Sequence, residues 1–336
     1  MFSWLLRMPD INVRAGQIFP GLLFCGALGA IATAIAAWGG SGVVWALLLG
    51  IAIASVRAPA ARWIGGIDFA SRHVLRLGVA LLGLQISAAA FHILSLTSVA
   101  VLAINVAAVL LAGALLGPII GIDRRLSLVL AAAVAICGAS AAAAFALVLL
   151  PDEAGRRDVG LTIGLVSLLS MSAMLLYAPI AQLMKLDPGG AGFLLGGSIH
   201  EVAHAVAAGY SIDQATGDIA TMTKLMRVAL LAPALLLTAW TQNVAEESNS
   251  VPRPPWFLVC FALFALANIA GLVPRVVSDM AAPSSRFCLV MAMAAIGLML
   301  PWRSLTAYGW RPLAMLLALT GLLFALCAAY VGISGL

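Results

Sequence analysis

The residues that could do chemistry are concentrated in the stretch 196–211, GGSIHEVAHAVAAGYS, which places His200, Glu201 and His204 inside an apolar segment. A charged side chain within such a segment is costly, faces the protein interior and indicates function. Histidine titrates near neutral pH, so a carboxylate between two imidazoles can bind and release a proton there. We therefore interpret Glu201 as a proton-coupling residue whose affinity is adjusted by His200 and His204. The alternative is a buried ion pair that orients the helices.

The same stretch also fits a zinc site, because residues 200–204 read HEVAH. On a helix, the pattern H-E-x-x-H can bind zinc through two imidazoles while the glutamate activates water. An intramembrane metalloprotease is therefore a competing hypothesis. It requires a third ligand on a later helix, but the downstream acids Asp213, Asp218 and Asp279 lie in or near predicted loops, and Asp187 lies upstream. We expect no metal, no cofactor and no enzymatic activity.

Two basic residues follow this stretch at helical spacing. Lys224 and Arg227 are three residues apart and so share one helix face. They would either neutralise an anionic substrate or pair with Glu201. Arg76 and Gln85 are the corresponding polar groups of an earlier apolar segment. For Arg76 and Lys224, which lie near predicted span ends, reaching out to the membrane interface is an alternative role.

Small residues at the middle of another apolar segment suggest a helix break. The segment contains AICGASAAAA, and Gly138–Ser140 lie near its midpoint. A half-helix that starts there would direct unpaired N–H groups at an anion. Gly297 holds a comparable place later in the chain, and tight helix packing is the alternative explanation for both. The candidate substrate-binding residues are Cys137, Gly138, Ala139, Ser140, Ser198, Lys224, Arg227 and Gln85.

The composition indicates which elements must position these residues. Of 336 residues, 63% are hydrophobic and 9% are charged, whereas a soluble domain carries about 25% charged residues. The apolar residues come in blocks of about 20, the length of a helix that crosses a bilayer. The net charge of +5 is then loop charge that fixes topology rather than a nucleic-acid interface. Five cysteines without a CxxC motif argue against a disulfide framework or zinc ribbon.

The apolar blocks predict an all-α polytopic membrane protein with about eleven spans and no soluble domain. The predicted spans are 17–38, 43–57, 66–88, 96–118, 125–150, 157–183, 190–208, 213–240, 255–273, 282–300 and 309–333. Eleven basic loop residues then fall on the side of the N-terminus and four on the other side. Basic residues collect in the cytoplasm, so we expect a cytoplasmic N-terminus and an outer C-terminus.

Two weak internal echoes suggest a repeat. RLSLVLAAA at 125–133 resembles RFCLVMAMA at 286–294, and VALL at 79–82 recurs at 228–231. Together they pair the third predicted span with the eighth and the fifth with the tenth. This predicts a single transporter domain in which one extra helix, 17–38, precedes two five-helix repeats at 43–183 and 190–333. An odd number of spans inverts the second repeat, and broken helices cross at the site.

Several blocks in order along the chain carry a resemblance to a known family. They are FPGLL (19–23), AAWGG (36–40), VLRLGVALLG (74–83), AICGASA (135–141), GGSIHEVAHAVAAG (196–209), KLMRVALLAP (224–233), AMAAIGL (292–298) and GWRPL (309–313). The chain resembles the YeiH-like sulfate exporter family of bacterial inner-membrane proteins, related to the bile-acid and cation–proton antiporter group. The resemblance implies an inner-membrane transporter with broken helices and an oxyanion substrate such as sulfate. His204 stands where that family usually has Gln, and Gln85 where it often has Arg.

These observations predict a secondary transporter in the bacterial inner membrane. It would export a small anion, sulfate or a related oxyanion, by proton-coupled alternating access. A cation/proton antiporter is the alternative, because the same fold and an intramembrane acid would serve it equally well. We expect the bilayer, a small anion and the proton as partners, no nucleic acid, and a chain that could assemble as a homodimer.

Overall fold

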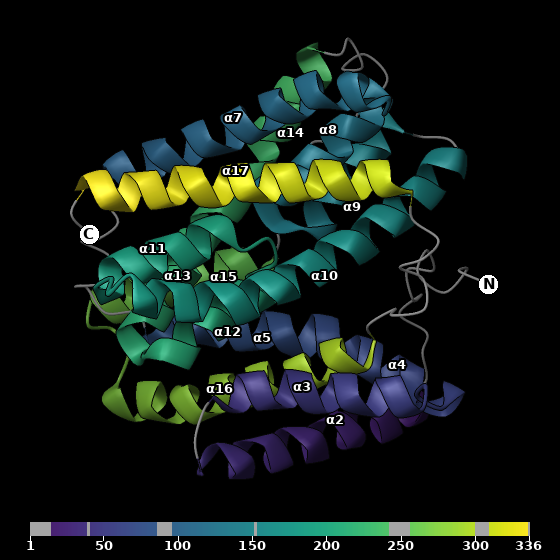
Figure 1. Ribbon diagram of the computed structural model, residues 1–336. Helices are drawn as coiled ribbons and strands as arrows, with labels where there is room; N and C mark the ends of the chain where they lie inside the picture. Colours follow the sequence, from purple (N-terminus) through teal and green to yellow (C-terminus); the bar gives the residue numbers. More distant parts are fainter. Residues whose placement is uncertain are drawn as a thin grey trace. The chain divides into compact units, whose positions relative to one another are not determined.

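The computed structural model describes residues 15–38, 41–85, 96–150, 153–241, 256–299 and 309–334, and every regular element in these ranges is helical (Figure 1). The predicted all-α class is therefore confirmed, and helix overlaps each predicted span. Within the described ranges, six helices are long and apolar enough to cross a membrane: Ile18–Ala36, Thr97–Ile120, Thr162–Leu183, Gln214–Thr238, Arg275–Leu298 and Trp310–Ser334. The count of eleven spans stays a prediction.

The chain divides into two compact units, each built from two separate stretches of sequence. Unit 1 comprises Met1–Ala89 and Pro255–Trp302, and unit 2 comprises Ala90–Pro254 and Arg303–Leu336. Each unit thus takes elements from both predicted repeats, 43–183 and 190–333. The spatial division of the chain does not follow its division into halves.

Unit 1 consists of helices that approach one another closely at glycines. Its elements are α2 (Ala15–Ala36), α3 (Gly42–Val56), α4 (Ala61–Phe69), the π-helical turn η1 (Ala70–Val74), α5 (Leu75–Leu82), the 3₁₀ turn η2 (Gly83–Gln85), α15 (Trp256–Ile269) and α16 (Arg275–Leu298). A Cβ atom at Gly50 of α3 would collide with the Ala294 carbonyl of α16, and one at Gly297 would collide with the Leu47 carbonyl. Membrane helices commonly pack through such small residues.

Gly297 therefore serves packing and does not break its helix. Helix α16 runs without interruption from Arg275 through Gly297 to Leu298. The suggestion of a break at this glycine was wrong, and tight packing is the correct alternative.

Unit 2 contains the predicted site. Its elements are α7 (Leu96–Ile120), α8 (Arg124–Ala132), the π-helical turn η3 (Ala133–Cys137), α9 (Ala139–Leu149), α10 (Glu153–Leu183), α11 (Pro188–Ser198), α12 (Val202–Ile212), α13 (Gln214–Ala229), α14 (Leu231–Thr241) and α17 (Trp310–Ser334). Aspartate N-caps begin three of them, because Asp123, Asp187 and Asp213 each accept a main-chain N–H of the following turn.

The chain turns back on itself at Gly138. Helices α8 and α9 pack against each other, although α8 ends at Ala132 and α9 begins at Ala139. Continued in a straight line, seven residues of helix would rise about 10 Å, so side-by-side packing requires a reversal. Gly138 makes it with a φ of 65°, in the left-handed region that glycine adopts without strain. We call α8, η3 and α9 the first hairpin.

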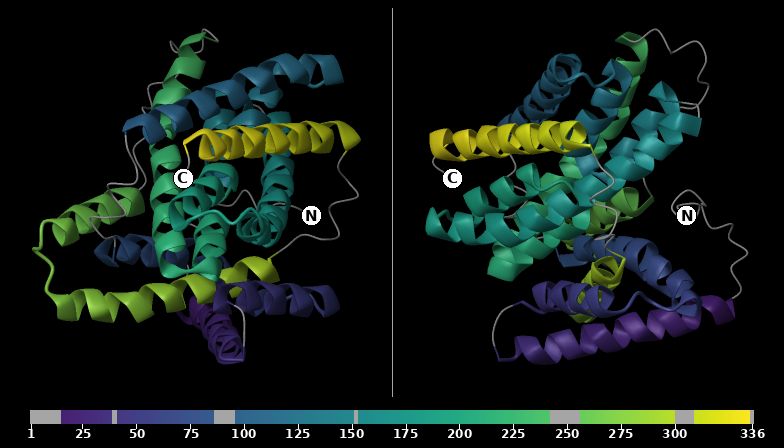
Figure 2. Two further views of the ribbon diagram at one scale, coloured as in Figure 1. Left: turned by 60° about the vertical axis from the view of Figure 1, so that its left-hand side comes forward. Right: turned by 45° about the vertical axis from the view of Figure 1, so that its right-hand side comes forward.

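A second hairpin forms from α11 and α12. Gly192 of α11 and Gly209 of α12 both lie against residues 216–220 of α13, whereas Gly196 lies further along, against Ala220 and Thr223. Helix α11 therefore runs parallel to α13, and α12 runs antiparallel to it. Residues 199–201 form the tip between them. The break predicted at Gly138 is thus present, whereas the break at residues 199–201 interrupts a span that the sequence predicted as continuous. In both cases the two half-helices fold back as a hairpin (Figures 1 and 2).

Gly50→Ala tests the close packing of unit 1. Its new methyl group would meet the Ala294 carbonyl, and overpacking of this kind costs about 1–3 kcal/mol. We expect a lower apparent unfolding temperature in detergent. Gly26→Ala on α2 is the matched control, because a Cβ atom there has nothing within 4 Å. Equal melting of the two variants would contradict this packing.

Candidate functional site

Two buried cations occupy the centre of unit 2. Lys224 and Arg227 lie on the same face of α13, and their relative exposures are 0% and 1%. The Lys224 ammonium donates to the Ile136 carbonyl at 2.9 Å and to the Ile199 carbonyl at 2.7 Å. These carbonyls belong to the tips of the first and second hairpins, so one side chain joins both tips.

Arg227 repeats this connection with its five donors. Its guanidinium donates to carbonyls of both hairpins, namely Val134 (2.8 Å), Ala135 (2.5 and 3.0 Å), Gly196 (3.4 Å), Gly197 (2.5 Å) and Ile199 (3.2 Å). The last carbonyls of a helix have no partner within it and carry the negative end of its dipole. The two cations therefore satisfy and neutralise the C-terminal ends of η3 and α11.

The sequence predicted two other partners for these cations, a substrate or Glu201. Every hydrogen bond recorded for the two side chains, within the ranges that the structure describes, goes to a main-chain carbonyl. Their role in holding the tips together is evident from this geometry. A direct contact with substrate stays a prediction.

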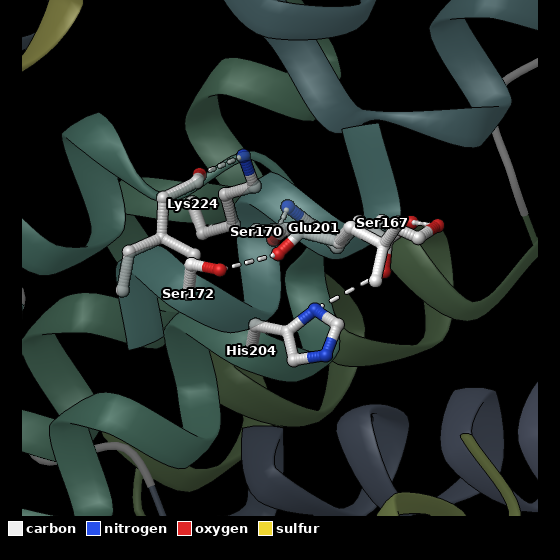
Figure 3. Close-up of polar contacts among 8 residues, drawn as sticks. Ser167, Ser170, Ser172, Glu201, His204 and Lys224 are labelled. Carbon is white, nitrogen blue, oxygen red and sulfur yellow. Dashed lines mark hydrogen bonds and ion pairs between the residues drawn. The ribbon is translucent and has the colours of Figure 1, made fainter. Parts of the chain in front are cut away.

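Glu201 is the residue that precedes α12, so it lies at the N-terminal, positive end of that helix (Figure 3). The two cations, in contrast, lie at the C-terminal, negative ends of η3 and α11. Its carboxylate accepts a hydrogen bond from the Ser167 hydroxyl at 2.6 Å, and its main-chain N–H donates to the Ser170 hydroxyl at 2.9 Å. The other carboxylate oxygen lies 3.1 Å from Nδ1 of His204. The side chain keeps 17% of its exposure. A negative charge is favoured here because it adjoins the positive end of α12.

The two breaks meet at Glu201. A Cβ atom on Gly138 would lie 2.7 Å from Cγ of Glu201, so only glycine leaves room for the carboxylate side chain. Helix α9 begins immediately after Gly138, where Ala139 is half-buried and Ser140 is exposed. The start of α9 and the Glu201 carboxylate are therefore accessible, whereas Lys224 and Arg227 are not.

The other predicted site residues contact neither Glu201 nor the two cations through a hydrogen bond that the described ranges show. Cys137 is a buried free thiol, and Ser198 donates to the Leu194 carbonyl of its own helix. His200 shares a hydrogen bond of 2.8 Å between its Nε2 and the Thr320 hydroxyl of α17. Gln85 belongs to unit 1, where its amide donates to the Ser285 hydroxyl at 2.6 Å.

Sequence reasoning missed two serines of α10. Ser167 and Ser170 contact the Glu201 side chain and main chain, respectively. Their signal was available in the sequence LVSLLSMS, because they are three residues apart on one helix face, the same spacing as Lys224 and Arg227. Serine is common in membrane helices, so the pair did not stand out.

The two histidines of the predicted zinc pattern do not share a helix. The pattern HEVAH requires both histidines on one helix, but α12 begins only at Val202, so His200 lies before it in the tip. No group of three histidine, cysteine or acidic side chains in the described ranges is placed to hold a metal ion. His200 instead contacts Thr320 of α17, and His204 adjoins Glu201.

The fold and site thus define a class, an all-α membrane protein with two helical hairpins whose tips converge on buried cations. Residues 20–316 match the family described as Conserved hypothetical protein 698. The match covers most of the chain, which therefore belongs to this family of membrane proteins.

Relatives of known sequence carry membrane-protein names. The chain is 37% identical to UPF0324 membrane protein CT0845 of Chlorobaculum tepidum, over 95% of this chain and 90% of the relative. It is 37% identical to UPF0324 membrane protein TauZ of Paracoccus denitrificans, over 90% and 91%. It is 32% identical to UPF0324 inner membrane protein YeiH of Escherichia coli, over 90% of each chain. The predicted likeness to YeiH is confirmed. No solved structure matches the chain.

Gly138→Ala tests the contact between the two breaks. The substitution places a methyl group against Glu201 and forces alanine into a left-handed backbone, which costs about 1–2 kcal/mol for the backbone alone. Gly271→Ala is the matched control, because its φ is 71° and a Cβ atom there meets nothing within 4 Å. We expect a larger loss of thermal stability for Gly138→Ala. Equal losses would mean that the Glu201 contact is unimportant.

Arg227→Lys tests the joining of the tips. Lysine keeps the charge but has three donors instead of five, so carbonyls of η3 and α11 lose their partner at about 1–3 kcal/mol each. We expect a strong drop in the yield of monodisperse protein on size exclusion. Arg275→Lys, at an exposed position of α16, is the control and should behave as wild type. Normal folding of Arg227→Lys would contradict a role for the guanidinium fork.

Proposed function

We propose that this chain is a secondary transporter that exports a small anion by proton-coupled alternating access. The observation that carries the proposal is the meeting of two helix breaks, in unit 2, at a buried Lys224–Arg227 pair beside an accessible carboxylate. Secondary transporters place their substrate and coupling-ion sites at such breaks near the membrane midplane. Charges buried within apolar segments are costly and by default indicate a functional site.

The start of α9 is the proposed anion contact. Its first main-chain N–H groups, at Ala139 and Ser140, carry the positive end of the helix dipole, and Ser140 adds an exposed hydroxyl. Lys224 and Arg227 would contribute long-range positive charge from beneath the tips. Sulfate or a related oxyanion is the substrate that the resemblance to the YeiH-like exporters implies.

Glu201 is the proposed proton-coupling residue. Its carboxylate adjoins the break at Gly138, where a negative charge would oppose an incoming anion. Protonation removes that charge, so that proton and anion favour each other's binding, and this coupling is reciprocal. Ser167, as a hydrogen-bond donor to the carboxylate, would hold it in place in both states.

We also infer that residues 43–183 and 190–333 are inverted repeats whose elements occur in permuted order. The first hairpin packs on α7 and the second on α17. Only α10 lies between the hairpins along the chain, so they would enter the membrane from opposite sides. This assignment pairs the two hairpins with each other, whereas the sequence echoes pair the fifth predicted span with the tenth.

The distribution of basic residues supports two re-entrant hairpins. If neither hairpin crosses the membrane, Arg156 and Arg157 move to the cytoplasmic side and Lys185 moves to the outer side. The bias of eleven to four then becomes twelve to three, which fits the positive-inside rule better. The N-terminus remains cytoplasmic and the C-terminus outside in this topology.

A cation/proton antiporter is the second candidate, and one observation favours it. The accessible charge at the tips is the Glu201 carboxylate, whereas both cations are buried against carbonyls. A carboxylate that alternately binds a proton and a metal cation is sufficient for such exchange. The two candidates differ in whether transport depends on the identity of the anion or of the cation.

Uptake of labelled sulfate into proteoliposomes, with and without a pH gradient, tests the proposal. We expect gradient-driven uptake in the wild type and loss of at least about 90% of it in Glu201→Gln, the typical result when a coupling interaction of about 1.4 kcal/mol or more is removed. Asp279→Asn, which removes an exposed carboxylate of unit 1, is the control and should transport normally.

The other outcomes separate the two candidates. Sulfate flux that survives in Glu201→Gln at every pH would remove Glu201 from the coupling. Wild-type vesicles that carry no sulfate but exchange protons for sodium or potassium would reject the anion exporter and establish the cation/proton antiporter.

A further inference from the structure

His204 has an environment that packing alone does not require. The ring is completely buried, with a relative exposure of 0%. Neither of its nitrogens makes a hydrogen bond to any part of the chain that the structure describes. Nδ1 lies 3.1 Å from the Glu201 carboxylate, as an ion-pair contact. A buried polar group is normally satisfied, so an imidazole left in this state needs a functional explanation.

The charges around His204 have both signs. Helix α13 presents Lys224 and Arg227 to this region, whose cations are held at the carbonyls of the two tips. Helix α10 presents the hydroxyls of Ser167 and Ser170, and residues 188–198 of α11 contain no ionisable side chain. On its own segment, His204 adjoins Glu201, with His200 before it. Glu201 is the acid in contact with the ring, as Figure 3 shows.

We propose that His204 is a second proton-binding residue of the transporter and that it exchanges its proton with Glu201. This inference rests on the proposed role of Glu201 in proton coupling. Glu201 keeps 17% of its side-chain exposure whereas His204 has none, so Glu201 is the route by which a proton reaches the imidazole. The pair then stores one proton in either of two positions.

The transfer is a single proton shift. The O–H bond of the protonated Glu201 breaks, and the proton forms an N–H bond with Nδ1 of His204. The neutral acid and neutral imidazole become a carboxylate and an imidazolium, and the total charge stays the same. The 3.1 Å between Nδ1 and the carboxylate oxygen is within hydrogen-bond distance, so the transfer is direct. Glu201 can thus be ionised while the proton remains inside the protein.

Histidine titration by NMR tests the proposal without any transport assay. Protein labelled with ¹³C at histidine Cε1 is titrated in detergent between pH 5 and pH 9, and loss of one signal in His204→Gln assigns it to His204. We expect that signal to titrate in the wild type. In Glu201→Gln it should stay constant across the range, because the carboxylate that would stabilise the buried imidazolium is gone. A His204 signal that titrates equally in both proteins, or in neither, would overturn the proposal.

The pH dependence of sulfate transport tests whether His204 takes part in proton coupling. His204→Gln leaves the pair with one proton-binding position instead of two, so this variant should transport sulfate with a pH profile moved by about one pH unit or more from that of the wild type. His73→Gln, an exposed histidine of unit 1, is the control and should keep the wild-type profile. An unchanged profile in His204→Gln would overturn the role in coupling. If wild type carries no sulfate, the anion proposal fails while the titration still decides the role of His204.

Discussion

The arrangement of unit 2 depends on one interaction, the capture of two sets of helix-terminal carbonyls by a single pair of cations. Breaking a helix inside a membrane leaves carbonyls without partners, and lipid offers them none. Lys224 and Arg227 supply those partners for both η3 and α11. Because the same two side chains serve both tips, the positions of the tips are fixed relative to each other.

This arrangement separates charge across the breaks. The cations lie at the C-terminal ends of η3 and α11, whereas Glu201 lies at the N-terminal start of α12. Each charge therefore faces the helix end of opposite sign. The cations are buried and donate to main-chain carbonyls, whereas the Glu201 side chain and the start of α9 keep part of their exposure.

The same glycine makes both the reversal and the contact. Gly138 adopts the left-handed conformation that turns the first hairpin, and its missing Cβ leaves the space that Glu201 fills. Gly138 is therefore restricted both by its backbone conformation and by its contact with Glu201. Through this residue, the turn of the first hairpin is in contact with the carboxylate side chain of the second.

The sequence by itself determined the all-α membrane class and singled out Glu201, Lys224 and Gly138. Apolar blocks of spanning length have one stable backbone in lipid, and Glu201, Lys224 and Gly138 stand out because polar or flexible residues are costly there. Only the tertiary structure decided that the broken helices fold back, that Gly297 packs instead of breaking α16, and that Ser167 joins Glu201. Local sequence specifies where a helix ends, but the direction in which the chain continues depends on which distant groups satisfy its freed carbonyls.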